Sequence, residues 1–128
     1  MNKHEIALAY VLRANKILET LFLITIKNST ASGTLESQEF ITFVQVIATS
    51  YHNTGVEYEH LEEYDRTLKF YLLAFSVTNK YLGAQHPLCS MFQQSFLQMK
   101  QKQENEKKPD RQELIHKALI KGKVNPKL

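Results

Sequence analysis

The chain has 128 residues, 43% of them hydrophobic and 23% charged, and a formal net charge of +3. Its length and apolar content suit one folded domain, while 4 Gly and 3 Pro residues are too few to separate many short strands. The single cysteine excludes an internal disulfide and a metal site made of several thiolates, which favours a reducing, cytoplasmic location.

Charge is distributed unevenly along the chain. Residues 1–99 contain 7 Lys/Arg and 9 Asp/Glu, whereas residues 100–128 contain 9 and 4. This asymmetry predicts a helical domain over residues 1–100 and a basic linker or tail over residues 101–128. A basic tail is usually only solvated, but it can also follow an acidic protein surface, a membrane or a nucleic acid.

The first predicted helix covers residues 6–27 and is apolar on nearly all of its faces. Its most apolar run, from Ile17 to Ile26, is about half as long as the roughly 20 residues that a membrane span needs. The first five residues begin an amphipathic polar stretch, so no secretory signal is expected either. We expect a buried helix, either central in the fold or covered by a partner.

The small polar residues from Asn28 to Thr34 predict an exposed loop. Ser37, or Thr34 before it, can cap a second helix, because their hydroxyl oxygens can accept from free backbone amides. The apolar positions of this helix run from Phe40 to Leu61 at spacings of three, four and seven residues.

A third helix is predicted from Tyr64 to Leu82, and Gly83 suits the left-handed position that follows a helix. A fourth helix has Pro87 in its first turn, where the missing N–H is not needed. Its apolar residues continue at helical spacing up to Met99.

The segment after the fourth helix lacks an apolar pattern. Residues 101–108 are all polar or charged, which predicts fraying into a solvated linker. A short last helix is expected over residues 110–121, where Asp110 and Glu113 can form a capping box.

One segment carries a spaced pattern of aromatic and small residues, at Tyr51, Gly55, Tyr58, Tyr64, Thr67, Tyr71 and Ala74. The pattern resembles the tetratricopeptide repeat (TPR), which is a pair of helices. Glycine inside a helix costs about 1 kcal/mol relative to alanine, so Gly55 predicts a close crossing of the second and third helices. Ala74 predicts a similar approach of the third helix to the fourth.

The end of this segment extends the resemblance. Residues 80–87 are similar to the Lys-x-Leu-Gly-x-x-His-Pro signature of kinesin-light-chain-like repeats, with matches that include Leu82, Gly83, His86 and Pro87. Such repeats are about 42 residues long. Counting 42 residues onward from Tyr51 and Gly55 reaches Gln93 and Leu97. These positions fall within the fourth predicted helix, as a next repeat requires, but they lack the aromatic and glycine residues of the signature. The fourth helix resembles a degenerate or capping repeat, and residues 6–19 resemble the second helix of a preceding one.

The resemblance implies an all-α, TPR-like α-solenoid of antiparallel helix pairs, with about four main helices and a short C-terminal one. It implies a scaffold or adaptor subunit that binds proteins in a cytoskeletal, motor-linked or ciliary complex. The first helix of each repeat lines the inner surface in this family, which gives candidate partner contacts at Thr49, His52, Asn53, Val56, Glu59 and His60. The same residues also fit an ordinary exposed helix face, because one repeat forms only a shallow groove.

A single full repeat has a consequence for stability. Repeats bury their apolar faces only against neighbours, and about three are usually needed for independent stability. We therefore expect a larger assembly to cover an apolar surface, either on the first helix or on the side of Phe92 and Phe96.

No residue constellation predicts catalysis or a cofactor. His52 and His60 lie eight residues apart, without a His-Glu-x-x-His pattern or a nearby cysteine, so no metal site is expected. Phosphate-binding loops and nucleophile elbows are also missing from the sequence. We expect no enzyme, no small-molecule substrate and no nucleic-acid binding by the helices.

An alternative function depends on the basic tail. The helices would then be a platform that presents residues 101–128 to an acidic partner such as tubulin, RNA or a membrane surface. Binding of this kind should weaken steeply as salt rises, because it releases counterions. Deleting the tail distinguishes the two functions.

Overall fold

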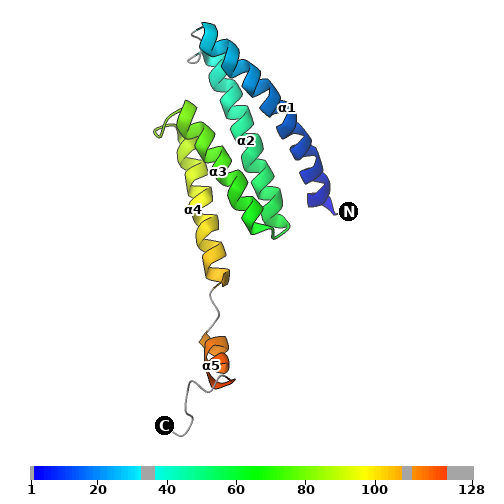
Figure 1. Ribbon diagram of the computed structural model, residues 1–128, viewed down its shortest axis with the longest axis vertical. Helices are drawn as coiled ribbons and strands as arrows, with labels where there is room; N and C mark the ends of the chain where they lie inside the picture. The colour runs from blue at the N-terminus through cyan, green and yellow to red at the C-terminus, as the bar shows by residue number, and fades with distance from the viewer. Residues whose placement is uncertain (1, 33–36, 108–110, 121–128) are drawn as a thin grey trace.

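The computed structural model describes residues 2–32, 37–107 and 111–120, which form five helices and, within these ranges, no strand. The helices are α1 (Lys3–Ser32), α2 (Gln38–His60), α3 (Tyr64–Tyr81), α4 (Pro87–Lys107) and α5 (Arg111–Ile120). Figure 1 shows α1 to α4 side by side in the order of the chain, with α5 set apart beyond the end of α4. The predicted all-α fold class is confirmed.

Two helix boundaries form at the residues that predicted them. The Ser37 side chain accepts a hydrogen bond from the Phe40 backbone N–H at 3.2 Å, which satisfies a free amide at the start of α2. Gly83 has a φ of 92°, and its N–H donates to the Thr78 carbonyl oxygen at 3.0 Å after the end of α3. Both predictions are confirmed, whereas Thr34 lies outside the described residues.

Two segments predicted as loop or linker are helical instead. α1 continues to Ser32, through most of the predicted loop, and α4 continues to Lys107, through the predicted solvated linker. Ordinary polar residues cost at most about 0.7 kcal/mol each in a helix, and extending an existing helix avoids the cost of nucleation. The apolar pattern therefore ends before the helix does.

The predicted short last helix is confirmed as α5, although Asp110 of its predicted capping box lies outside the described residues. Three of its apolar side chains are exposed, at Ile115, Leu119 and Ile120. The packing that holds α1 to α4 together therefore leaves this part of α5 uncovered.

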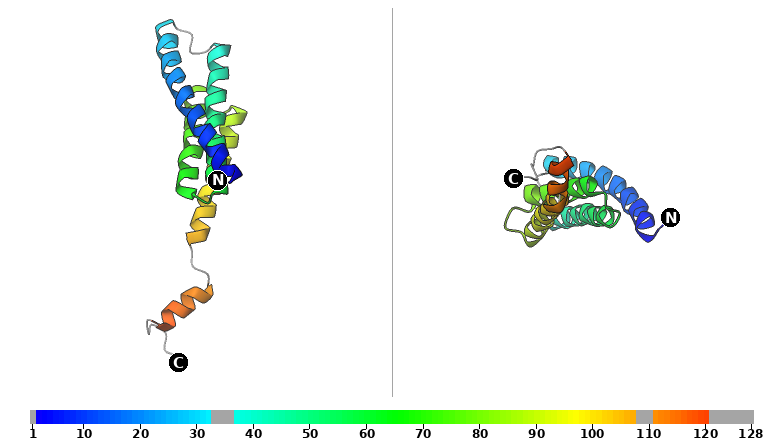
Figure 2. Two further views of the ribbon diagram at one scale, coloured as in Figure 1. Left: turned by 90° about the vertical axis from the view of Figure 1, so that its right-hand side faces the viewer. Right: turned by 90° about the horizontal axis from the view of Figure 1, so that it is seen from below.

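Neighbouring helices in α1 to α4 run antiparallel, as Figure 2 shows from two further sides. Contacts between α1 and α2 join the pairs His4–Glu57, Asn15–Thr54 and Phe22–Phe40. Contacts between α2 and α3 join Tyr58–Phe70 and Phe40–Tyr81. In both sets the residue number rises on one helix as it falls on the next, which defines the antiparallel order.

Asn15 provides a buried polar link between α1 and α2. It is 3% exposed, and its side-chain N–H donates to Thr54 Oγ1 at 2.8 Å. Its Oδ1 accepts from the Ser50 hydroxyl at 2.6 Å. A buried amide without partners costs free energy, so these bonds favour one register of α1 along α2.

The core lies where α2, α3 and α4 meet, and its buried residues are Ile47, Ala48, Tyr51, Ala74 and Phe92. Ala74 is 0% exposed, as expected for a close approach of α3 to α4. Phe92 is 1% exposed and occupies this core, so its side of α4 is not a free docking surface. The prediction of a docking surface is therefore wrong for Phe92, which α2 and α3 already cover, whereas Phe96 is half-buried.

The crossing of α2 and α3 is closest at Gly55. A Cβ atom at this position would lie 2.5 Å from ring carbons of Tyr71 and 3.3 Å from the backbone oxygen of Thr67. No side chain fits at the first distance without a shift of the ring. The close crossing that Gly55 predicted is confirmed.

The other signature residues divide between the core and the α3–α4 turn. Tyr51, Tyr58, Thr67 and Tyr71 are buried, Tyr64, Leu82, Gly83 and His86 are half-buried, and Pro87 is exposed. His86 Nδ1 accepts the Leu88 N–H at 3.1 Å, which satisfies a free amide at the start of α4.

α1 differs from the buried helix that the sequence predicted. One side packs on α2, and Leu18 and Phe22 reach the core. The other side is open, with Tyr10 67% and Ile17 63% exposed. The reason is its position, because α1 stands at the edge of the array, where it packs mainly on α2 and touches α3 through Phe22 and Tyr81 (Figure 1).

Candidate protein-interaction site

The six candidate contacts on α2 divide into two groups. Thr49, Asn53 and His60 are exposed and Val56 is half-buried, and their spacing of four, three and four residues places them in one row along the helix. We call these four residues the α2 row. A polar row of this kind, with one apolar member, can contact a partner through both hydrogen bonds and packing.

The other two candidates, His52 and Glu59, turn toward α4. The His52 ring lies 4.9 Å from the Tyr71 ring and 5.0 Å from the Phe92 ring, and its Nε2 is 3.1 Å from Ser95 Oγ. His52 therefore holds α2 against α3 and α4 in this structure.

Glu59 forms the second link to α4. Its Oε1 accepts from the Tyr71 hydroxyl at 2.9 Å, and its Oε2 lies 3.6 Å from Lys102 Nζ. Burial raises the pKa of Tyr71, and the hydrogen bond to Glu59 and its negative charge add to the rise. Tyr71 therefore stays a hydrogen-bond donor over the physiological pH range.

Contacts between α2 and α4 occur at a nearly constant offset. The pairs His52–Ser95 and Glu59–Lys102 join residues 43 apart, and Gln45 contacts His86, 41 residues further on, in the turn just before α4. Residue numbers rise together along both helices, so α2 and α4 are parallel. These offsets lie within one residue of the 42 used in counting from Tyr51 and Gly55 to the next helix.

Lowering the pH is expected to weaken the fold through His52. Burial lowers the pKa of His52, and the charge of Glu59 opposes this only in part. The unfolded chain, with an ordinary His pKa of about 6.5, then binds the proton more readily than the folded chain. Stability should therefore be lost as the pH falls below that value.

Urea unfolding at pH 7.5 and at pH 5.5 tests this expectation. The loss in the free energy of unfolding between the two pH values should be smaller in His52→Gln, which has no ionisable group there, than in the unmodified chain. His116→Gln, on exposed α5, is the matched control and should behave like the unmodified chain. Equal losses in all three proteins would contradict the assignment.

The end of α2 is held by the start of α1, through a residue that no sequence pattern had predicted. His4 Nδ1 lies 2.8 Å from Glu57 Oε2, and its ring stacks on His60 with centroids 4.1 Å apart. The last member of the α2 row therefore lies beside α1. A partner on this row would also meet the first turn of α1.

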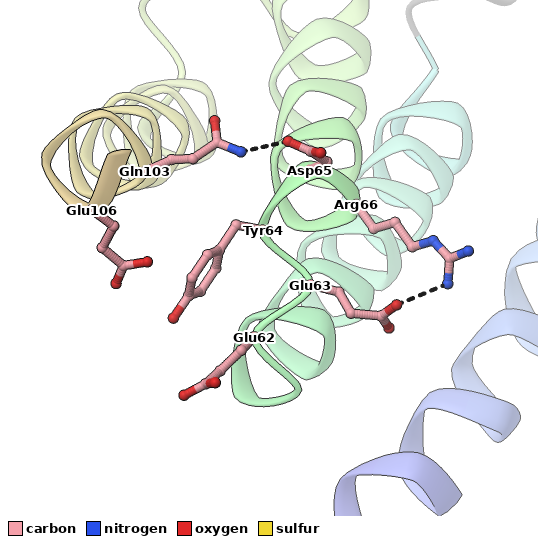
Figure 3. Close-up of a pocket in the computed structure, with 7 residues that line it drawn as sticks. All are labelled: Glu62, Glu63, Tyr64, Asp65, Arg66, Gln103 and Glu106. Atoms are coloured by element: carbon pink, nitrogen blue, oxygen red, sulfur yellow. Dashed lines mark hydrogen bonds and ion pairs between the residues drawn. The ribbon is translucent and has the colours of Figure 1, made fainter. Parts of the chain in front are cut away.

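An open hollow of about 530 Å³ lies beyond the turn between α2 and α3 (Figure 3). Four of its lining residues are acids, Glu62, Glu63, Asp65 and Glu106. Gln103 donates to Asp65, Arg66 lies 3.2 Å from Glu63, and Tyr64 stands between the two sides of the hollow. The lining of this hollow therefore contains more acidic than basic side chains.

The described residues contain no group of three or more His, Cys, Asp or Glu side chains that could hold a metal ion. Among these same residues, no helix has the length and apolarity that crossing a membrane requires. Protein-family models, curated proteins and solved structures were compared with the chain. None of them matches it. The TPR hypothesis accordingly depends on the residues and contacts of the chain itself.

Proposed function

We propose that the chain is a non-enzymatic protein–protein interaction module, a scaffold or adaptor subunit of a larger complex. In this proposal α2 and α3 form one TPR-like repeat, α1 is the second helix of a preceding repeat, and α4 begins the next. The observation that carries it is the parallel contact of α2 with α4 at an offset of 43 residues, together with the contact of α2 with the turn before α4 at 41 residues. A regular offset between alternate helices is what stacked helix pairs produce.

The proposed binding surface is the α2 row. His52 and Glu59 already have partners on α3 and α4. Thr49, Asn53, Val56 and the exposed His60, which also stacks on His4, can contact an incoming protein segment. The kinesin-light-chain-like residues at the α3–α4 turn suggest a cytoplasmic complex of cytoskeletal or ciliary type.

Replacing Asn53 with arginine is expected to weaken partner binding at least about tenfold, which corresponds to about 1.4 kcal/mol. Asn53 is exposed at the centre of the α2 row, so the longer side chain should obstruct the partner without disturbing the core. A photo-crosslinking residue at Asn53 would first capture the partner in cells. Titration calorimetry with the purified partner then measures the affinity.

Gln94→Arg supplies the matched control, because Gln94 is also exposed but lies on α4. Its affinity for the partner should equal that of the unmodified chain. If Asn53→Arg binds as tightly as Gln94→Arg, the α2 row is not the binding surface.

The alternative function, a helical platform that presents the basic tail, is favoured by one observation. α5 exposes Ile115, Leu119 and Ile120 close to the basic Lys117, so the tail offers apolar and positive groups together. Deleting residues 108–128 separates the functions, since the interaction-module proposal requires binding to survive. The cut belongs after Lys107 because Lys102 and Gln103 contact α2 and α3.

A further inference from the structure

The open side of α1 carries a continuous apolar row. Ile6, Tyr10, Ile17, Leu21 and Ile24 follow one another at spacings of four, seven, four and three residues, and all five are exposed. These spacings place them on one face of the helix. We call these five residues the α1 row.

The two edges of the helix array differ in polarity. α4 is at the other edge, and its exposed residues include Gln93, Gln94, Gln98 and Gln101. End helices of stacked repeats need a polar outer face to remain soluble. α4 is therefore suited to end the array, whereas α1 is suited to be covered.

Charges along the α1 row are positive. Arg13 lies within the row, three residues after Tyr10 and four before Ile17, and Lys3 and Lys27 continue it at its two ends. Lys16 is adjacent to Ile17. All four cations are exposed, and none of them forms an ion pair with another described residue.

The two acids of α1 are engaged elsewhere. Glu5 accepts from the Asn2 N–H at 3.2 Å in the first turn, and Glu19 accepts from the Tyr51 hydroxyl at 3.0 Å on the side of α2. The α1 row therefore combines an apolar surface with cations that form no ion pair with another described residue, although Glu19 lines the same hollow as Arg13 and Lys16.

We propose that the α1 row binds an amphipathic helix of another protein, one with an apolar stripe flanked by acidic residues. This inference rests on the proposed function, because it names the chemistry of one partner of the interaction module. A helix laid along α1 would continue the array beyond its apolar edge, and its acids would pair with Arg13 and Lys16. Beside the row lies an open hollow of about 340 Å³, lined by Leu12, Arg13, Asn15, Lys16, Glu19 and Phe70. Leu12 and Phe70 in this lining can receive an apolar side chain.

A second copy of the chain fits the row less well. Two antiparallel α1 helices centred on each other would place Lys3 opposite Lys27 at both ends, and two parallel ones would place Arg13 opposite Arg13. Neither arrangement supplies an acid. Like charges placed opposite each other across an interface disfavour it.

An anionic membrane surface also fits less well. A helix that lies on a bilayer keeps its charges beside or above the apolar face, where they reach the headgroups. Arg13 is within the α1 row, between Tyr10 and Ile17, and would have to enter the apolar layer.

Two synthetic amphipathic peptides test the proposal against the full chain. Each has about 25 residues, enough to span the row at 1.5 Å per residue, and the same leucine stripe, with glutamates flanking the stripe in one and lysines in the other. Fluorescence anisotropy should show the glutamate peptide binding at least about tenfold more tightly than the lysine peptide.

Variants of α1 make the test specific. Ile17→Glu should abolish binding of the glutamate peptide, while Leu97→Glu, an exposed apolar position on α4, should leave it unchanged. The double variant Arg13→Glu/Lys16→Glu should reverse the preference, so that the lysine peptide binds more tightly. Circular dichroism melting verifies that each variant is folded, which is expected because all four positions are exposed.

Three outcomes would overturn the proposal. Recognition by charge would be excluded if the two peptides bound equally tightly, or if neither bound. A dimer in sedimentation that Ile17→Glu converts to monomer would identify a second copy as the occupant. Binding to phosphatidylserine-containing vesicles that Ile17→Glu abolishes, without peptide binding, would identify a membrane. The Asn53 experiment does not involve the α1 row, so its result and this one can fail independently.

Discussion

Replacing Phe92 with alanine is expected to lower the free energy of unfolding by about 3–5 kcal/mol, the range for truncating a buried aromatic side chain. Phe92 is 1% exposed and belongs to the core cluster with Ile47 and Ala74, and its ring lies 5.0 Å from His52. Truncation would remove the largest fully buried side chain from the packing of α4 on the rest of the array. Urea unfolding followed by circular dichroism measures the change.

The control for this prediction lies on the same helix. Leu97 is 54% exposed, so Leu97→Ala should change the free energy of unfolding by less than about 0.5 kcal/mol. If Phe92→Ala is as stable as Leu97→Ala, α4 does not pack on α2 and α3 in the manner described.

Replacing Gly55 with valine is expected to cost about 3 kcal/mol of stability, at the upper end of the range for overpacking a core. The new Cβ would meet Tyr71 ring carbons at 2.5 Å. The ring cannot turn away easily, because it is 4% exposed, stacks on His52 and donates to Glu59. Thermal unfolding of Gly55→Val is compared with that of Asn53→Val, a substitution at an exposed position two residues earlier on α2. The comparison separates the steric clash with Tyr71 from the cost of placing a β-branched residue in a helix.

A double-mutant cycle identifies the source of the cost. In a Tyr71→Ala background the ring is absent, so Gly55→Val should cost at least about 1 kcal/mol less than it does in the unmodified chain. Additive effects of the two substitutions would show that Gly55 and Tyr71 are not in contact.

The parts of the fold that could be predicted are those with a local signal. Gly55 and Ala74 are small residues inside apolar helical patterns, where a small residue is unfavourable unless another helix comes close. Ser37 and Gly83 mark helix ends through their own hydrogen bonding and backbone freedom. Each of these expectations needed only a few neighbouring residues.

The parts that could not be predicted depend on which helices are neighbours. α1 is apolar on most faces, and the sequence does not say that only one of these faces is covered. In the sequence, His52 and Glu59 look like the other polar residues of α2. Only the position of α4 shows that these two form contacts between helices. The contact of His4 with Glu57 joins residues 53 apart and leaves no local pattern.

The candidate site therefore contains fewer residues than the sequence suggested. Four of the six candidate residues remain available for a partner in the α2 row, and two hold the array together. The α1 row adds a second surface of different character. An adaptor with one polar and one apolar surface can hold two proteins at once, which is the role proposed for this chain.

Nuclear magnetic resonance titration tests the central claim most directly. The isotope-labelled chain would be titrated with the protein captured through Asn53, while the backbone amide signals are followed residue by residue. We expect the largest shifts between Thr49 and His60, with small shifts in the tail. Shifts confined to residues 101–128 would contradict the proposal that the helices form the interaction module.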